Sequence, residues 1–400
     1  MREAAGGSVS TANWQGAKVW RTVGTLALGL LLYFGLPTVA PVPDAKAFAG
    51  QPAPAKPAPA TPAKESMPAV NPVAPSAALS EAESKAKAAV RQEMIRFIGR
   101  SNINAGLLFG SYNERSGEVK ILTEGAIEKN DDLRVACPIT KPCVAYMVLK
   151  HGLNLDSSIN RWFPVEKGYT KADTITLRML LYHTSGIRDF ARVVKIDPYR
   201  TVTPIETINL AYQNQALDFM PGAKYQYSNT DYNILGTILA QTSHKSFEEL
   251  IKAYFASVSP TLRVDDGKGK YPRGYSTPWP YHWSTSGYAG GLISTAEDAM
   301  KVFSYITKSP EYQQMTEWIK DSEKSNHLVG MGIFAFDNFH EFGRAVYYDG
   351  DMMANQMFII KIGDVIYYFH TTHRVMLEDL IDLSYRVISL VGTQWELRRP

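Results

Sequence analysis

Cysteine and metal-ligand motifs are scarce in this chain. Its 400 residues include two cysteines, Cys137 and Cys143, too few for a disulfide framework, so a packed core must stabilise the fold. The eight histidines show no HExxH or Cys/His spacing of the kind that holds zinc. Packing or solvation at a strand end explains the closest pair, His370 and His373, better than a metal does. The sequence therefore predicts no metal site and no cofactor.

An excess of one charge is also missing. Lys and Arg total 42 against 39 Asp and Glu, a formal net charge of +3, and the basic residues are scattered among acidic ones. Nucleic-acid binding needs a concentrated basic stripe, so no nucleic-acid partner is expected. Hydrophobic residues make up 45% and charged residues 20% of the chain, which suits a globular protein with one large domain.

One apolar run stands near the amino terminus. A basic segment, residues 1–21, precedes residues 22–42, whose apolar part at 23–36 is interrupted by Pro37. This order indicates an export segment, with the amino terminus inside and the rest of the chain outside. Two fates remain open. The segment is either an uncleaved inner-membrane anchor or a cleaved signal peptide. The anchor is favoured slightly, because the Ala-x-Ala sites at 45–49 lie far beyond the apolar run. Both predict a periplasmic or otherwise extracytoplasmic location.

A spacer and then a domain follow the apolar run. Residues 50–79 are dominated by Pro and Ala, a composition that favours extended, solvated backbone. The composition changes at Ser80, which we expect to cap a helix, with Glu83 at the reciprocal capping position. Four apolar residues at helical spacing predict the buried face of this helix: Val90, Met94, Ile95 and Ile98. We therefore predict one domain over residues 80–400.

Strand-like runs lie at both ends of this domain. Residues 105–113 and 118–125 flank a turn-rich connection and predict a hairpin. Near the carboxyl end, further runs predict strands at 329–337, 345–349, 356–361 and 364–370, and an amphipathic helix at 377–394. With a helix-rich middle, these elements predict an α+β fold. An antiparallel sheet assembled from distant segments would be flanked by the terminal helices, beside a helical subdomain.

Three segments together carry a family resemblance. They are RVACPITKPCVAYMVLKHGLNLDSSINRWFP; ITLRMLLYHTSGI followed by PGAKYQYSNTDYNILGTIL; and GYAGGLISTAEDAMKV. From about Ala88 to Leu390 the chain resembles the superfamily of class C β-lactamases, D-alanyl-D-alanine carboxypeptidases and penicillin-binding-protein-like esterases. The resemblance implies the β-lactamase/transpeptidase fold and the site of a serine acyl hydrolase.

Three elements carry the chemistry of that family. A Ser-x-x-Lys opens a helix, the Ser attacks an acyl carbon, and the Lys and the Tyr of a Tyr-x-Asn element move its proton. A Lys-Thr-Gly or His-x-Gly strand orients the substrate, and two backbone N–H groups hold the oxyanion. The resemblance assigns the Lys to Lys141, and the Tyr-x-Asn element to Tyr227 and Asn229.

The nucleophile position departs from the family pattern, because Pro138 stands where the Ser is expected. Proline has no nucleophilic side chain and no N–H to donate to an oxyanion, and losing one such donor costs about 3 kcal/mol in a working hydrolase. Proline is favoured at the first position of a helix, so the helix should survive and the reaction should not. Cys137 is the alternative nucleophile. It would share a helix face with Lys141 if the helix began early, but we expect the helix to start at Pro138.

The third element has also changed. Tyr348-Asp349-Gly350 stands in place of His-x-Gly, and it keeps the glycine that permits close backbone approach. Asp349 and Asp351 add negative charge that would repel a ligand carboxylate. The predicted ligand-binding positions are Asn229, Tyr348, Gly350 and Gly290.

Two further groups of residues would shape the pocket. Met352 and Met353 would narrow it, and the aromatic segment with Trp279, Tyr281 and Trp283 is either a binding lip or a packed loop.

These features predict a catalytically inactive domain of the cell envelope that binds a ligand or acts as a scaffold. A cell-wall peptide or glycan, or another envelope protein, is the expected partner class, inferred from export and from the family. Two alternatives stay open. One is an active acyl hydrolase (carboxypeptidase, β-lactamase or esterase) that uses a non-standard nucleophile such as Cys137. The other is a purely structural interaction module.

Overall fold

The structure is a computed structural model. It describes residues 77–100, 105–127, 134–135, 137–193, 200–213, 217–265, 283–322, 325–352 and 355–394. The predicted export segment and most of the spacer therefore lie outside the described residues, as do Trp279, Tyr281 and Met353. Within the described ranges, no helix is both long and apolar enough to cross a bilayer.

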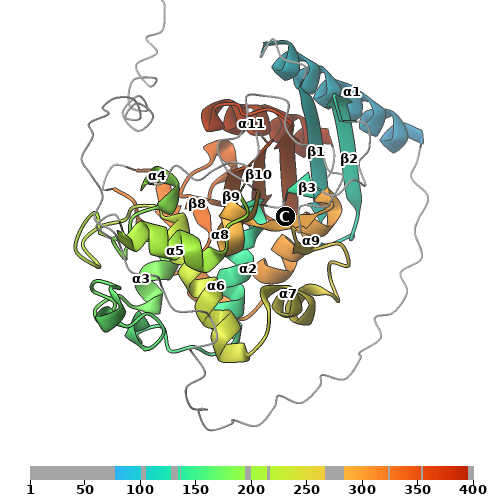
Figure 1. Cartoon of the computed structure of the whole chain (residues 1–400). Coiled ribbons are helices and arrows are strands. Elements are labelled where there is room, and N and C mark those ends of the chain that lie inside the picture. Colours follow the sequence, from blue (N-terminus) through green and yellow to red (C-terminus); the bar gives the residue numbers. More distant parts are fainter. Residues whose placement is uncertain are drawn as a thin grey trace, which may run out of the picture. The chain divides into compact units, whose positions relative to one another are not determined.

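An antiparallel sheet of eight strands forms the centre of the domain, in the order β2-β1-β11-β10-β9-β8-β7-β6 (Figure 1). Its strands are β1 (Gly106–Asn113), β2 (Val119–Gly125), β6 (Ile319–Lys320), β7 (His327–Val329), β8 (Phe334–Phe336), β9 (Ala345–Met352), β10 (Asn355–Ile362) and β11 (Val365–Thr371). Strands from the two ends of the domain are neighbours, since Leu107 of β1 pairs with Thr371 of β11. This confirms the predicted hairpin and the predicted assembly of the sheet from distant segments.

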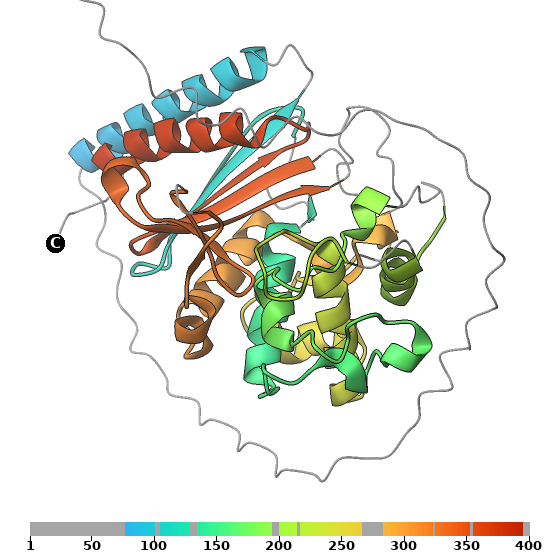
Figure 2. The ribbon, with the colours of Figure 1, turned by 90° about the vertical axis from the view of Figure 1, so that its left-hand side faces the viewer.

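The terminal helices α1 (Ala77–Arg100) and α11 (Leu377–Gln394) pack against each other on one face of the sheet (Figure 2). The bounds of α11 are those predicted from its amphipathic pattern. Helix α1 begins before Ser80, so Ser80 lies inside the helix and does not cap it. The prediction for its buried face was wrong at Ile95, which is 54% exposed. Because Val90 and Met94 are fully buried, the packed face is turned away from Ile95.

Helices of the middle region cover the opposite face of the sheet. Helix α2 (Cys137–Lys150) packs on β9 and β10, and α9 (Ala296–Thr307) packs on β1 and β11. The remaining helices are α3 (Leu177–Leu181), α4 (Phe190–Val193), α5 (Pro204–Gln213), α6 (Asn229–Ser243), α7 (Phe247–Phe255), α8 (Gly287–Gly290) and α10 (Glu311–Met315). A small sheet, β3-β5-β4, pairs β5 (Leu292–Ser294) with β3 (Arg134–Val135) and β4 (Arg263–Val264). This α+β architecture is the predicted one.

The start of α2 differs from the prediction. The helix begins at Cys137, one residue before Pro138, so Cys137 belongs to its first turn. Pro142 lies inside the helix and has no N–H to donate to the carbonyl four residues earlier, which is that of Pro138. The first two turns of α2 are therefore poor in backbone donors.

The run predicted as one strand over 329–337 is divided into β7 and β8 by a tight turn. Gly332 in this turn has a φ of 72°, which glycine adopts without strain. A side chain there would meet α2, because a Cβ on Gly332 would lie 2.8 Å from the carbonyl oxygen of Lys141. The turn thus fixes the position of α2 beside the sheet.

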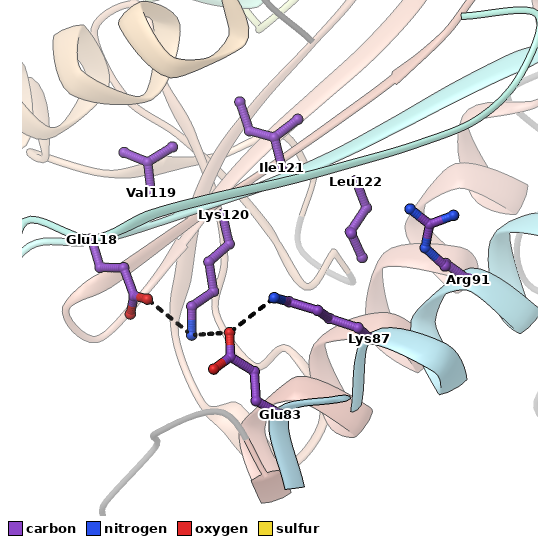
Figure 3. A pocket seen from close by; sticks show the side chains of 8 residues that line it. All are labelled: Glu83, Lys87, Arg91, Glu118, Val119, Lys120, Ile121 and Leu122. Atoms are coloured by element: carbon purple, nitrogen blue, oxygen red, sulfur yellow. Dashed lines mark ion pairs between the residues drawn. The ribbon is translucent and has the colours of Figure 1, made fainter. Parts of the chain in front are cut away.

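A groove of about 480 Å³ lies between α1 and β2, at one edge of the sheet (Figure 3). One ion pair crosses it, from Glu83 of α1 to Lys120 of β2 at 3.4 Å, and Glu83 also pairs with Lys87 of its own helix at 3.1 Å. Lys120 also pairs with Glu118 at 3.2 Å. These charges protect an edge strand from pairing with another chain, and none of the residues lining the groove belongs to the site described next.

Candidate functional site

Lys141 lies at the centre of the site and is 1% exposed. Its Nζ donates hydrogen bonds to Asn229 Oδ1 at 2.9 Å and to the Ala289 carbonyl oxygen at 2.7 Å. The same nitrogen lies 4.9 Å from the centre of the Tyr227 ring. We call these four residues the Lys141 cluster. A buried ammonium needs such partners, because its desolvation is costly.

The side chain of Asn229 links the cluster to the loop before α4. Its Oδ1 accepts hydrogen bonds from Lys141 and, at 3.3 Å, from the Tyr227 hydroxyl. Its Nδ2 donates to Asp189 Oδ2 at 3.1 Å, which fixes the orientation of the amide. Asp189 is 4% exposed, and burial raises the pKa of its carboxyl group.

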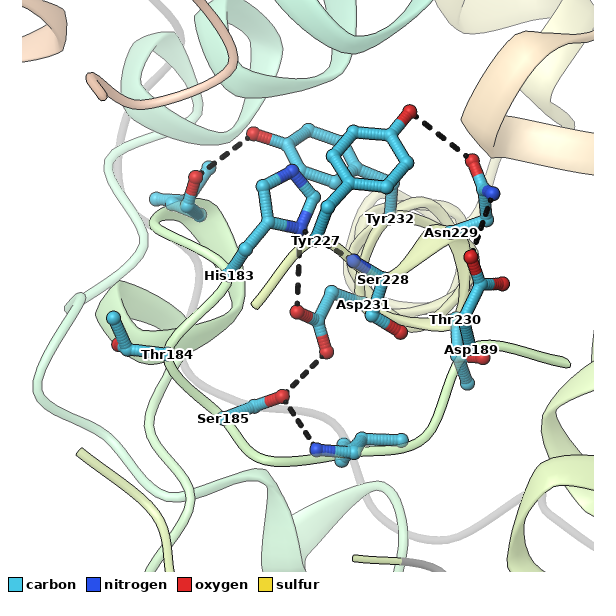
Figure 4. A network of polar contacts seen from close by, with 12 residues as sticks. His183, Thr184, Ser185, Asp189, Tyr227, Ser228, Asn229, Thr230, Asp231 and Tyr232 are labelled. Carbon is cyan, nitrogen blue, oxygen red and sulfur yellow. Dashed lines mark hydrogen bonds and ion pairs between the residues drawn. The ribbon is translucent and has the colours of Figure 1, made fainter. Parts of the chain in front are cut away.

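A second polar network holds the segment that carries Tyr227 and Asn229 (Figure 4). Ser185 Oγ donates to Asp231 Oδ1 at 2.6 Å. The Ser228 N–H donates to His183 Nδ1 at 3.3 Å, and Asp231 Oδ2 lies 3.4 Å from the same ring nitrogen. His183 and Asp231 are both fully or almost fully buried.

The geometry indicates that His183 and Asp231 form a neutral pair. Because His183 Nδ1 accepts the Ser228 N–H, it carries no proton, and an ionised Asp231 would repel its lone pair. Burial raises the pKa of Asp231. Burial, and then the charge of Lys141, lower the pKa of His183. A carboxylic acid on Asp231 and a neutral imidazole satisfy all of these contacts, so this pair positions the start of α6.

Strand β9 carries the third predicted element. Tyr348 is 1% exposed and its ring stacks on Phe334, with centroids 5.0 Å apart. Gly350 is buried and pairs with Met357 of β10. Asp349 is only partly exposed, and desolvation raises the pKa of its carboxyl group to about 6 although Lys141 acts in the opposite direction.

Asp351 is in a different situation from Asp349, because it is paired. Arg374 Nε lies 2.6 Å from its Oδ2. Burial raises the pKa of Asp351 to about 6, and Arg374 counteracts the rise. Met352, predicted to narrow the pocket, is buried, and its sulfur accepts a hydrogen bond from the Ser286 hydroxyl at 3.0 Å.

The other predicted positions lie around this centre. Gly290 is buried at the end of α8, next to Ala289, whose carbonyl oxygen binds Lys141. Cys143 is a buried free thiol, so it is not in a disulfide with Cys137. His370 Nε2 lies 2.9 Å from Asn355 Oδ1. The described residues contain no group of three or more His, Cys, Asp and Glu side chains that would hold a metal ion.

Sequence reasoning missed two parts of the site. Asp189 and the Ala289 carbonyl hold Asn229 and Lys141, and His183 and Asp231 hold the start of α6. His183 lies within the quoted LLYHTSG segment and Asp231 within YSNTDY, so the motifs contained both. Their spacing in the sequence does not show that the two side chains meet.

The family model named Beta-lactamase matches residues 138–387 of this chain, and these include Lys141, the Tyr227 segment and β9. The chain belongs to the beta-lactamase family. Its sheet, its two packed terminal helices and the helical subdomain have the β-lactamase/transpeptidase fold.

Relatives with different activities share this fold. The solved D-amino acid amidase of Ochrobactrum anthropi SV3 superposes with a TM-score of 0.66 and 20% identity, over 78% of this chain and 100% of the amidase. A beta-lactamase/D-alanine carboxypeptidase from Pseudomonas syringae gives a TM-score of 0.59 and 15% identity, over 78% and 99%. A probable fimbrial assembly protein FimD of Dichelobacter nodosus is 33% identical over 189 residues, which is 42% of this chain and 46% of that protein. This chain therefore matches less than half of the FimD protein.

Proposed function

We propose that this beta-lactamase-family domain binds a ligand at the Lys141 cluster without forming an acyl-enzyme. The observation that supports the proposal is the start of α2, where Pro138 stands three residues before Lys141. Acyl transfer needs a nucleophile and oxyanion donors, and proline supplies neither a hydroxyl nor an N–H. Lys141, Tyr227 and Asn229 meanwhile keep polar groups that can bind an amide.

The proposed ligand is a peptide or glycan of the cell wall, or a segment of an envelope protein. The basic and apolar segments over residues 1–42 and the spacer at 50–79 support an extracytoplasmic location. The domain would be held at the inner membrane by residues 22–42, or released after their cleavage.

One observation favours a second function, an acyl hydrolase that uses Cys137. Because α2 begins at Cys137, this residue and Lys141 are four positions apart within one helix. Residues at this spacing occupy one helix face, and a thiol activated by a basic group can act as a nucleophile.

Intact mass spectrometry separates the two functions. The purified protein is incubated with a penicillin or a fluorophosphonate, and no added mass is expected. An adduct that is lost in Cys137→Ala and kept in Cys143→Ala, a matched thiol of the same helix, would establish the hydrolase instead. An adduct at any other residue would also contradict binding without acylation.

A further inference from the structure

The two ends of β9 are held by different numbers of strands. Strand β8 pairs with β9 only as far as Tyr347, opposite Phe334. Beyond that point, within the described residues, β9 pairs with β10 alone. An edge segment has ladder hydrogen bonds on one side only. Contacts outside the ladder are therefore needed to fix residues 348–352, which include the predicted ligand-binding positions Tyr348 and Gly350.

The connection between β11 and α11 supplies contacts of this kind. We call it the connecting segment, residues 372–376. The Thr372 N–H donates to the Gly106 carbonyl oxygen at 3.0 Å, and the Gly106 N–H donates to Thr372 Oγ1 at 2.8 Å. The Val375 N–H donates to Gln356 Oε1 at 3.1 Å. The connecting segment is thus bound to β1 and to β10, the two neighbours of β11 in the sheet.

Arg374 extends these contacts by one strand, to β9. Its Nε lies 2.6 Å from Asp351 Oδ2, and Asp351 stands opposite Gln356 in the register of β9 and β10. The side chain of Asp351 is 22% exposed and that of Arg374 is 68% exposed. An exposed ion pair contributes little to stability, but removal of Arg374 would leave a largely buried carboxylate without its cation. The pair therefore acts mainly on the position of Asp351.

We propose that Arg374 is a positioning residue of the ligand site, because through Asp351 it holds the end of β9 that carries Tyr348 and Gly350. Asp351 directly follows Gly350 and lies three residues after Tyr348, so a displacement of Asp351 moves both positions. The inference rests on the proposed function only in taking these two positions to face a ligand. Arg374 acts on the ligand through β9 and does not contact it.

Hydrogen exchange tests this role in the purified full chain, with no ligand present. The measurement is the protection of backbone amides in overlapping peptides by mass spectrometry, corrected for the intrinsic exchange rate at each pH. At pH 8, Arg374→Gln should speed the exchange of residues 348–352 by about three- to fivefold. Arg374→Lys should stay close to the wild type, because it keeps a cation opposite Asp351. Unchanged exchange at 348–352 in Arg374→Gln would overturn the inference, as would a lysine variant as fast as the glutamine variant.

Arg344 is the matched control at the other end of β9. Its Nε donates to Asp337 Oδ1 at 3.2 Å, and both side chains are about half exposed. Arg344→Gln should leave the exchange of residues 348–352 as it is in the wild type. An equal acceleration along all of β9 in Arg374→Gln would show a general loss of stability and would contradict a positioning role.

The pH dependence of the Arg374→Gln effect separates the ion pair from packing of the arginine side chain. Burial raises the pKa of Asp351 to about 6, and Arg374 counteracts the rise. Asp349, on the same strand, is the other charged group that acts with it. At pH 8 Asp351 is ionised and the charge of Arg374 stabilises it. At pH 4.5 Asp351 is protonated in the wild type as well, so the acceleration should be nearly absent.

An acceleration of the same size at pH 8 and pH 4.5 would contradict the ion-pair role. In an Asp351→Asn background, Arg374→Gln should add nothing at either pH, and a full effect there would overturn the inference. None of these measurements involves a ligand or an acyl adduct. Failure here therefore leaves binding without acylation intact, whereas an adduct seen by intact mass overturns that function and leaves the positioning role of Arg374 to the exchange data.

Discussion

The α6 side and the β9 side of the Lys141 cluster differ in how their polar groups are paired. On the α6 side, Asn229 uses both ends of its amide, and Asp231 contacts both Ser185 and His183. On the β9 side, Asp349 forms no ion pair in the described structure, and the enclosed Tyr348 hydroxyl lies beside that of Tyr227. Paired buried groups stabilise a fold and unpaired ones destabilise it. The contrast is one of degree, because the Ser228 hydroxyl on the α6 side also lacks a hydrogen-bond partner in the described structure.

The largest expected effect is a loss of stability when Asp231, on the α6 side, is replaced. Asp231→Ala leaves Ser185 and His183 without a partner in the core and should lower the free energy of unfolding by about 3 kcal/mol. Asp231→Asn should cost less than about 1 kcal/mol, because a neutral amide can accept from Ser185 and donate to His183 as the protonated acid does. Urea denaturation measures both variants.

The control for this pair is Asp218→Ala. Asp218 is exposed and bonds Arg188 at 2.7 Å, so its loss should cost less than about 1 kcal/mol. An Asp231→Asn variant as unstable as Asp231→Ala would contradict the neutral pair and would show that Asp231 is ionised.

On the β9 side, substitution of Asp349 should raise the free energy of unfolding, not lower it. The pKa of Asp349 is raised to about 6 in the fold, above its usual value, so its protonated form is favoured. Stability is therefore highest at pH values below the pKa that Asp349 has in the unfolded chain. It falls as the pH rises through 6, where Asp349 of the folded protein loses its proton. Asp349→Asn should therefore raise the free energy of unfolding at pH 8 by on the order of 1 kcal/mol, allowing for partial exposure, and should change little at pH 4.

Urea denaturation of the wild type and Asp349→Asn at both pH values checks this prediction. Asp351→Asn is the matched comparison and should gain less, because it also removes the partner of Arg374. A loss of stability in Asp349→Asn at pH 8 would show that Asp349 is already satisfied.

The smallest expected effect is that of Pro138→Ser at the start of α2. Serine and proline are both accepted at a helix start, so the free energy of unfolding should change by less than about 1 kcal/mol. Little hydrolysis of a chromogenic β-lactam or ester should return, since Tyr348 and Asp349 do not present the cation expected of the third element. Robust turnover would show that β9 still orients a hydrolytic substrate.

Local patterns in the sequence predicted much of the fold. The strand-like runs of β1 and β2, with a turn-rich connection between them, and the helical period of α11 were sufficient to predict these elements, although β1 is buried on both faces over 106–111. The prediction failed where position depends on packing. Ile95 fits the helical period of α1 but is exposed, and the run at 329–337 turns at Gly332, where α2 lies too close for a side chain.

The motifs led to Lys141, Tyr227 and Asn229, whose side chains the structure brings into contact. They could not identify the groups that hold these residues. Asp189 is distant in sequence from Asn229, and Ala289 contributes a carbonyl oxygen that any residue has.

The pairing of β1 with β11 also bears on how the domain is made. Leu107 and Thr371 are neighbours in the finished sheet but stand near opposite ends of the domain. During synthesis, the hairpin of β1 and β2 cannot pair with β11 until that much later segment has left the ribosome. Folds dominated by such non-local pairing form slowly. The hydrophobic hairpin therefore stays exposed for a long period, during which we expect chaperone binding to matter most.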